Sequence, residues 1–319
     1  MNFSLLLENL TNPALLFFIL GIVAVLIKSD LAIPDNTSKF ISLYLLFSIG
    51  FKGGQELSHE SFDHVLVIKL IFGCALSLCI PLYTFFILKR RFNVYDAAAI
   101  AASYGSVSAV TFVTAVTYME LKGFAVSGHM VAIMALMEFP AIIISILLMS
   151  IYDQQNEKRI GSLMKHALTN GSVVLILGSL IIGLLANPLQ AEGIRPFTTD
   201  IFKGFLSIFL LNMGIVSGGK LKSLFKHGIA PFFFAIFIPL INGCIVAYIS
   251  RFIMQDISDQ FIFSILAASA SYIAVPAAMK IAAPKSNPGL FIPMALAITF
   301  PINITIGMPL FYFILTNIK

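Results

Sequence analysis

Two stretches rich in small and polar residues interrupt otherwise apolar segments of the sequence. They read ASYGSVSAVT at 102–111 and ASASYIAVPAA at 268–278. Glycine, serine and proline favour an interrupted helix here, where a plain membrane-spanning helix would carry leucine and isoleucine. An interruption frees N–H groups at one half-helix N-terminus, which favours an anion, and carbonyls at the other half's C-terminus, which favours a cation. The stretches therefore predict an anion and a cation bound side by side; close helix packing through small residues is the alternative.

Glu138 is the one carboxylate that the sequence places deep inside an apolar segment, just before Pro140. Carboxylates within a membrane are functional candidates, although a structural glutamate bonded to a neighbour is the alternative. Thr299 and Asn303, in a similar stretch of the second half, offer neutral oxygen atoms that suit a hard cation. We predict that Glu138, Thr299 and Asn303 bind a hard cation such as sodium. Protonation of Glu138 is one alternative, and hydrogen bonding of Thr299 and Asn303 between helices is another.

The composition indicates which elements must position these residues. Hydrophobic residues make up 59% of the 319, charged residues only 11%, and the mean hydropathy is +0.96, whereas soluble domains carry about 25% charged residues. The net charge of +5 does not indicate nucleic-acid binding, because the basic residues form short clusters between apolar runs. We predict an all-α integral membrane protein of about ten transmembrane helices. The expected segments are 12–27, 38–51, 65–88, 94–117, 128–151, 169–187, 199–216, 228–250, 259–282 and 289–315.

The two halves of the chain resemble each other at a nearly constant offset. The matching pairs are 40–50 with 205–214, each followed by a Gly pair; 101–103 with 267–269; and 134–144 with 294–304. Five helices per repeat is an odd number, so the second repeat must be inverted in the membrane, as in many secondary transporters. We predict a first repeat at 1–151, a short cytoplasmic linker at 152–168 and an inverted second repeat at 169–319, with helices 4 and 9 discontinuous. The segments at 38–51 and 199–216 are expected to be short or tilted, because each runs into its Gly pair.

Basic residues predict the orientation. Thirteen of the twenty lie in loops after odd-numbered segments, and cytoplasmic loops retain lysine and arginine. Both termini are therefore expected on the non-cytoplasmic side. Lys69, inside the third segment, is expected to extend to the membrane interface, while His129 and His166 are expected to face water.

At these residues the sequence resembles the sodium-dependent bicarbonate transporters of cyanobacteria, over nearly the whole chain. The matching stretches are IGFKGG at 49–54, YGSVSAVT at 104–111, MEFPA at 137–141, AASASYIAVPA at 267–277, and the run from Pro284 through SNP at 286–288 to Pro309. The resemblance implies two inverted five-helix repeats and uptake of bicarbonate with sodium at crossing, broken helices. It places the substrate at Gly105, Ser106, Val107, Ser108, Ser269, Ala270, Ser271 and Tyr272.

Two departures from the family pattern limit what the resemblance implies. Tyr272 stands where the cyanobacterial proteins have an aspartate, which leaves the anion and the number of sodium ions open; Glu138 takes the place of another family aspartate. The loop at 152–166 lacks the long cytoplasmic insertion of those proteins, so regulation by a docking partner is not implied.

The functional prediction is a multi-pass transporter of the cytoplasmic (inner) membrane that couples sodium influx to uptake of a small anion, most simply bicarbonate. The alternatives are a sodium- or proton-coupled symporter for another small carboxylate, and a receptor or scaffold without transport. An enzyme is not expected, because no nucleophile–base pair or metal cluster stands at plausible spacing. The expected partners are the anion, sodium and the lipid bilayer. The sequence does not decide whether the protein forms a homo-oligomer. A plain helical course through both polar stretches would favour the scaffold.

The orientation can be tested with reporter fusions after residues 92 and 319. We expect opposite signals, because residue 92 lies in a predicted cytoplasmic loop and residue 319 on the other side. Equal signals from two well-expressed fusions would contradict both the orientation and the inverted repeat.

Overall fold

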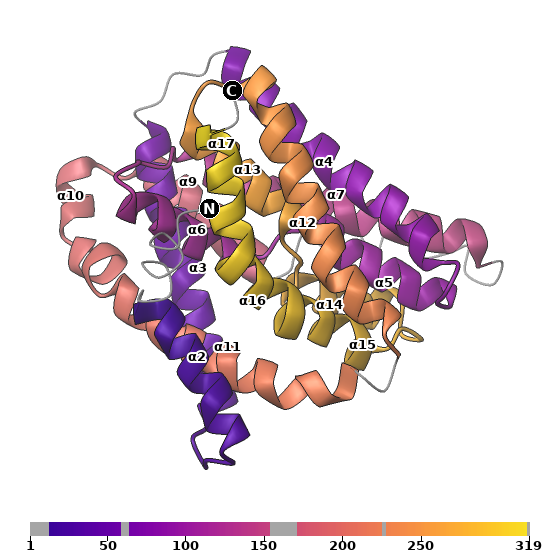
Figure 1. Cartoon of the computed structure of the whole chain (residues 1–319). Coiled ribbons are helices and arrows are strands. Elements are labelled where there is room, and N and C mark those ends of the chain that lie inside the picture. The colour runs from indigo at the N-terminus through magenta and orange to yellow at the C-terminus, as the bar shows by residue number, and fades with distance from the viewer. Residues whose placement is uncertain (1–12, 59–63, 154–170, 225–227, 318–319) are drawn as a thin grey trace.

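The computed structural model describes residues 13–58, 64–153, 171–224 and 228–317. Helices dominate these ranges, and none of them contains a strand (Figure 1). Within these ranges, six helices are long and apolar enough to cross a membrane, which agrees with the predicted all-helical, multi-pass membrane protein. The predicted linker from residue 154 onward, with His166, lies outside the described residues. The six helical spans are 64–88, 94–121, 129–152, 196–219, 230–253 and 288–317.

One group of helices packs in two close pairs, α2 on α11 and α3 on α9. Glycines allow these backbones to touch. A Cβ atom added to Gly214 of α11 would lie 2.1 Å from the carbonyl oxygen of Phe18 in α2, and one added to Gly183 of α9 would lie 2.2 Å from that of Phe51 in α3. Small residues at such positions replace the hydrophobic effect as the means of helix association in lipid. We call this group the first bundle: α2 (Pro13–Leu26), α3 (Asp35–Ser58), α9 (Gly171–Leu185) and α11 (Phe202–Leu224).

Neither Gly pair ends its helix, so the expectation of short segments at 38–51 and 199–216 is wrong. α3 runs through Gly53 and Gly54, and α11 continues to Leu224. The reason in α3 is packing: a Cβ atom on Gly54 would lie 2.0 Å from the carbonyl oxygen of Leu180. The two short elements α10 (Pro188–Glu192) and η1 (Pro196–Asp200) connect α9 to α11.

The remaining helices form a second bundle, with α5 and α13 at its centre. Every residue from Asp96 to Gly105 in α5 and from Ser258 to Ala268 in α13 is buried. α4 packs on α5 and α7, while α12 packs on α13 and α17 (Figure 1). The second bundle comprises α4 (His64–Leu88), α5 (Val94–Gly105), α6 (Ala109–Leu121), α7 (His129–Tyr152), α12 (Ala230–Ile253), α13 (Ile257–Ala268), α14 (Ala274–Ala282) and the C-terminal helices from Pro288 to Asn317.

Both predicted interruptions are present. α5 ends at Gly105 and α6 begins at Ala109, with Ser106 to Ser108 between them. α13 ends at Ala268 and α14 begins at Ala274. The plain helical course that would have favoured a scaffold is therefore excluded.

The last segment contains two π-helical stretches that the sequence analysis did not predict. α15 (Pro288–Pro293) continues as η3 (Met294–Thr299), α16 (Phe300–Ile302), η4 (Asn303–Gly307) and α17 (Met308–Asn317). Pro301 lies between the two stretches and cannot donate a backbone hydrogen bond. π-Helical turns often occur at functional sites, and these two contain Thr299 and Asn303.

A glycine pair within α9 tests the packing argument. Gly183→Ala should lower the free energy of unfolding by about 1–3 kcal/mol or more, because its Cβ atom would clash with the backbone of α3. Gly178→Ala in the same helix meets nothing within 4 Å and should be neutral or stabilising by up to about 1 kcal/mol. Thermal unfolding of the two variants in detergent gives the measurement. Equal melting temperatures would refute the proposed contact between α9 and α3.

Candidate functional site

The two interruptions bond directly to each other inside the second bundle. The N–H of Ser271 donates to the carbonyl oxygen of Ser103 at 2.8 Å, and the Ser103 hydroxyl donates to the carbonyl oxygen of Ser271 at 2.9 Å. The N–H of Ser108 donates to Ser269 Oγ at 3.1 Å. All four serines are buried. Each interruption therefore satisfies backbone groups that the other leaves free, as a backbone away from water requires.

A small cavity of about 20 Å³ lies where the interruptions meet the first bundle. We call it the junction cavity. Its walls combine the starts of α6 and α14 with one side of α7, and Leu46 of α3 and Ile176 of α9 cover it. Such a volume holds about one water molecule. The remaining lining residues are Val107, Ser108, Ala109, Met134, Ala135, Glu138, Ser271, Tyr272, Ile273 and Ala274.

Two helix N-termini converge on the junction cavity. Ser108 Oγ caps α6 by accepting the N–H of Thr111 at 3.2 Å. At the start of α14, Ser271 Oγ accepts the N–H of Val275 at the longer distance of 3.4 Å. Within the described ranges, the N–H groups of Ala109 and Ala274 make no hydrogen bond. Free N–H groups and the positive ends of two helix dipoles make this position suitable for an anion.

Glu138 faces the same cavity from α7. Its side chain is half-buried, and no described residue forms an ion pair or hydrogen bond with it. The hydroxyl of Tyr272 is buried beside Ser108 and has no hydrogen-bond partner of ordinary geometry in the described ranges. An anion at the helix N-termini would be repelled by a bare Glu138 carboxylate unless a cation or proton neutralised it.

The structure divides the eight residues expected at the substrate. The junction cavity is lined by Val107, Ser108, Ser271 and Tyr272 but not by the other four. Gly105 packs against α4, where a Cβ atom would lie 2.1 Å from the Pro81 ring. Ser269 accepts the N–H of Ser108, while Ser106 and Ala270 are buried next to the cavity-lining residues.

Thr299 and Asn303 do not line the cavity that contains Glu138. The Thr299 hydroxyl donates to the carbonyl oxygen of Ala235 at 2.8 Å and bonds to the Tyr104 hydroxyl at 2.8 Å. Asn303 Nδ2 donates to the carbonyl oxygen of Ala268, at the C-terminus of α13, at 2.6 Å. Asn303 Oδ1 is buried without a partner among the described residues, so it is available to a cation there.

A larger cavity of about 770 Å³, the vestibule, lies between α3, α6 and the start of α11. Phe112 and Val113 on its wall follow Ala109 of the junction cavity by one helical turn. Glu120 of α6 lies 2.9 Å from Lys52 Nζ and 4.0 Å from Lys203 Nζ, so an ion pair joins the two bundles across the vestibule. Along α6, the vestibule therefore comes within one helical turn of the junction cavity.

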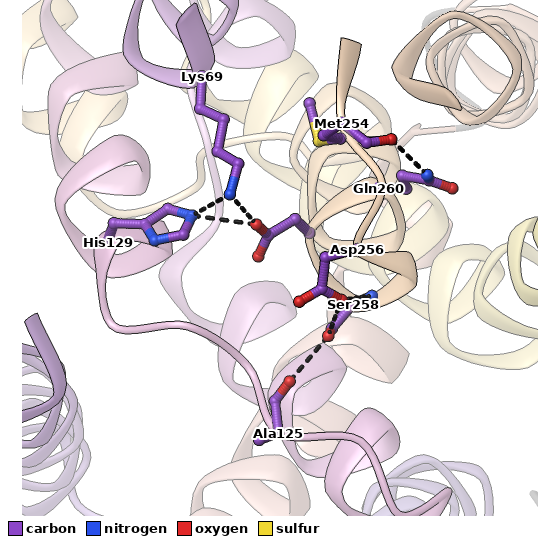
Figure 2. A network of polar contacts seen from close by, with 8 residues as sticks. Lys69, Ala125, His129, Met254, Asp256, Ser258 and Gln260 are labelled. Carbon is purple, nitrogen blue, oxygen red and sulfur yellow. Dashed lines mark hydrogen bonds and ion pairs between the residues drawn. The ribbon is translucent and has the colours of Figure 1, made fainter. Parts of the chain in front are cut away.

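A buried charged cluster in the second bundle was not predicted from the sequence. Asp259 Oδ2 of α13 lies 2.5 Å from Lys69 Nζ of α4 and 3.1 Å from His129 Nε2 of α7 (Figure 2). Lys69 does not extend to the interface and His129 does not face water, so both expectations are wrong. Asp259 also means that Glu138 is not the only buried carboxylate. One sequence signal could have indicated it: Asp259 is the third residue of α13, as the buried Asp96 is of α5.

Sequence comparison gives one family. The model described as the Na⁺-dependent bicarbonate transporter superfamily matches residues 13–316, which include both interruptions and Glu138. Comparison with curated proteins yields no match.

Proposed function

We propose, because the chain belongs to the Na⁺-dependent bicarbonate transporter superfamily, that it couples sodium influx to uptake of a small anion, with bicarbonate as the leading candidate. The family confirms the resemblance drawn from the sequence and makes the chain a member of a family of transporters. The observation that carries the proposal is the junction cavity, where two helix N-termini meet beside an unpaired carboxylate.

The anion would bind at the starts of α6 and α14. Free N–H groups there and the hydroxyls of Ser108, Ser271 and Tyr272 can donate to the oxygen atoms of a carboxylate or bicarbonate. Bicarbonate has four heavy atoms and exceeds the space of about one water molecule. Leu46 and Ile176 must therefore withdraw when the anion binds, which makes binding sensitive to the contact between the bundles.

Sodium would couple through Glu138. A carboxylate in a poorly hydrated cavity must bind a cation or take up a proton. Sodium at Glu138 cancels its repulsion of the anion, so each ion strengthens binding of the other, and this coupling is reciprocal. One sodium with one monovalent anion moves no net charge, and a tenfold sodium gradient supplies about 1.4 kcal/mol, enough for roughly tenfold accumulation.

Thr299 and Asn303 remain proposed sodium ligands, at a place separate from the junction cavity. Asn303 Oδ1 is unpartnered in the described chain and lies close to the C-terminus of α13, where the helix dipole favours a cation. The number of sodium ions then depends on whether both places bind one.

We further propose ten spans in two inverted repeats, 1–151 and 169–319, with the linker 152–168 in the cytoplasm and both termini on the opposite side of the inner membrane. The starts of α5 and α13 support this arrangement. Asp96 of α5 accepts the N–H of Asn287 at 2.7 Å, whereas Asp259 of α13 contacts His129 at the start of α7. The C-terminal ends of the two half-helices meet at the interruptions, as an inverted pair requires.

A second candidate is proton-coupled uptake of another small carboxylate. No described residue bonds to Glu138. That observation supports proton coupling as much as sodium coupling, because protonation also neutralises the carboxylate. Uptake into proteoliposomes under a sodium gradient or a pH gradient separates the two candidates.

Two serines test the anion site. Ser108→Ala and Ser271→Ala should each weaken the apparent affinity for bicarbonate by about 1.5–3 kcal/mol, because a hydrogen bond to a charged group is lost. Roughly tenfold to hundredfold higher KM for uptake is the expected readout. Ser264→Ala is the matched control, since among the described residues that buried hydroxyl bonds only to the carbonyl oxygen of Gln260 in its own helix. An unchanged KM in both test variants would show that the anion binds elsewhere in the protein.

Glu138→Gln tests the coupling ion. Wild-type uptake should be stimulated by sodium near neutral pH, and the variant should lose that stimulation while still reaching the membrane, because the amide cannot neutralise a cation. Uptake that follows a pH gradient and ignores sodium would favour the proton candidate. Sodium stimulation that persists in a well-expressed Glu138→Gln protein would show that another residue couples the ion.

A further inference from the structure

We propose that Asp259 is a positioning residue for transport: through Lys69 and His129 it fixes α13 along its axis and so aligns the interruption after Ala268 with the one after Gly105. The inference rests on the proposed function and assigns a role to the charged cluster that neither the family nor the junction cavity explains.

The cluster ties three helices to one oxygen atom. Asp259 Oδ2 lies within bonding distance of Lys69 Nζ of α4 and His129 Nε2 of α7, and these two nitrogens are 3.2 Å apart (Figure 2). The Asp259 side chain is fully buried, and its Oδ1 has no hydrogen-bond partner in the described ranges. Buried charges are costly, and well-packed apolar groups often give equal stability, so an ion pair here points to geometry as its contribution.

Neighbouring contacts hold the same end of α13. The Ser258 hydroxyl donates to the carbonyl oxygen of Ala125 at 2.8 Å, and Gln260 Nε2 donates to the carbonyl oxygen of Met254 at 2.7 Å (Figure 2). The Ser258 bond crosses to the segment before α7, whereas the Gln260 bond stays within the turn before α13. Asp259 is the one charged link among them between α13 and the first half of the chain.

α13 is suited to transmit this position to the interruption. It has 12 residues, which makes it about 18 Å long at 1.5 Å per residue, and it is buried almost throughout. At its other end, Ser269 and Ser271 bond to the α5–α6 interruption. Those bonds tolerate only a few tenths of an ångström before they weaken, so an axial shift of α13 would alter the wall of the junction cavity.

α5 carries a comparable link in the opposite direction. Asp96, also the third residue of its helix, accepts the backbone N–H of Asn287 at 2.7 Å and Asn93 Nδ2 at 2.6 Å. Each buried half-helix is therefore bound at its start to the other half of the chain by a carboxylate. The difference is that Asp259 bonds to the side chains of Lys69 and His129, so its link can be changed from either side by substitution, whereas the partner of Asp96 is a backbone N–H.

The test compares Asp259→Asn and the double variant Lys69→Met/Asp259→Asn, which leaves no unpaired buried lysine, with Asp256→Asn. Asp256 is the matched control: it lies at the same end of α13, its carboxylate accepts the backbone N–H of Ser258 in its own turn at 2.8 Å, and asparagine caps a helix as well as aspartate. Both test variants should raise the KM for sodium-driven bicarbonate uptake by about fivefold or more, with little change in Vmax per folded transporter. The control should retain the wild-type KM. A purely structural role would lower the amount of folded protein and leave KM unchanged, which would overturn the proposal.

A second readout does not depend on transport. Ile273 is 37% exposed and lines the junction cavity, so Ile273→Cys in a chain without Cys74, Cys79 and Cys244 can report the alignment by its rate of labelling with a thiol reagent. Asp259→Asn and the double variant should change that rate about threefold or more, and Asp256→Asn should not; equal rates would overturn the proposal. Absence of bicarbonate uptake in the wild type would contradict the proposed function, while the labelling rates would still decide this inference.

Discussion

The reciprocal hydrogen bonds between Ser103 and Ser271 are the constraint on which the site depends. An interrupted helix exposes N–H and carbonyl groups that no lipid can satisfy, so it persists only where protein or trapped water supplies partners. Here each interruption supplies partners for the other. These hydrogen bonds hold the ends of α5 and α13 together, while the starts of α6 and α14 face a common cavity.

Close packing of small residues brings the two helix ends near enough to form these hydrogen bonds. Ala97 to Ala102 of α5 are all fully buried, and Gly105 lets the end of α5 rest against the Pro81 ring of α4. Larger side chains would separate the helices and lengthen the bonds between the interruptions. The first bundle then contributes only Leu46 and Ile176 to the wall of the junction cavity, so the contact between the bundles helps to enclose the site.

The sequence predicted the features that depend on local residue type. Glycine, serine and proline marked both interruptions, and the position of Glu138 in an apolar run placed it on the cavity that they form. The Gly pair at 53–54 was misleading, because glycine serves there for backbone contact with α9 and does not end the helix. Lys69 was misplaced for a different reason: its partner Asp259 is 190 residues away, and no local pattern shows that two helices bring such charges together. The π-helical turns around Pro301 likewise depend on how the last segment packs.

If the converging helix N-termini accept an anion only when a cation neutralises Glu138, sodium must strengthen the binding of bicarbonate to the purified protein. Equilibrium binding of labelled bicarbonate can be measured as sodium replaces potassium at constant ionic strength and pH. We expect bound bicarbonate to rise with sodium, and the affinity for sodium to rise with bicarbonate by the same factor. Bicarbonate binding that is equally strong in sodium and in potassium would contradict this expectation.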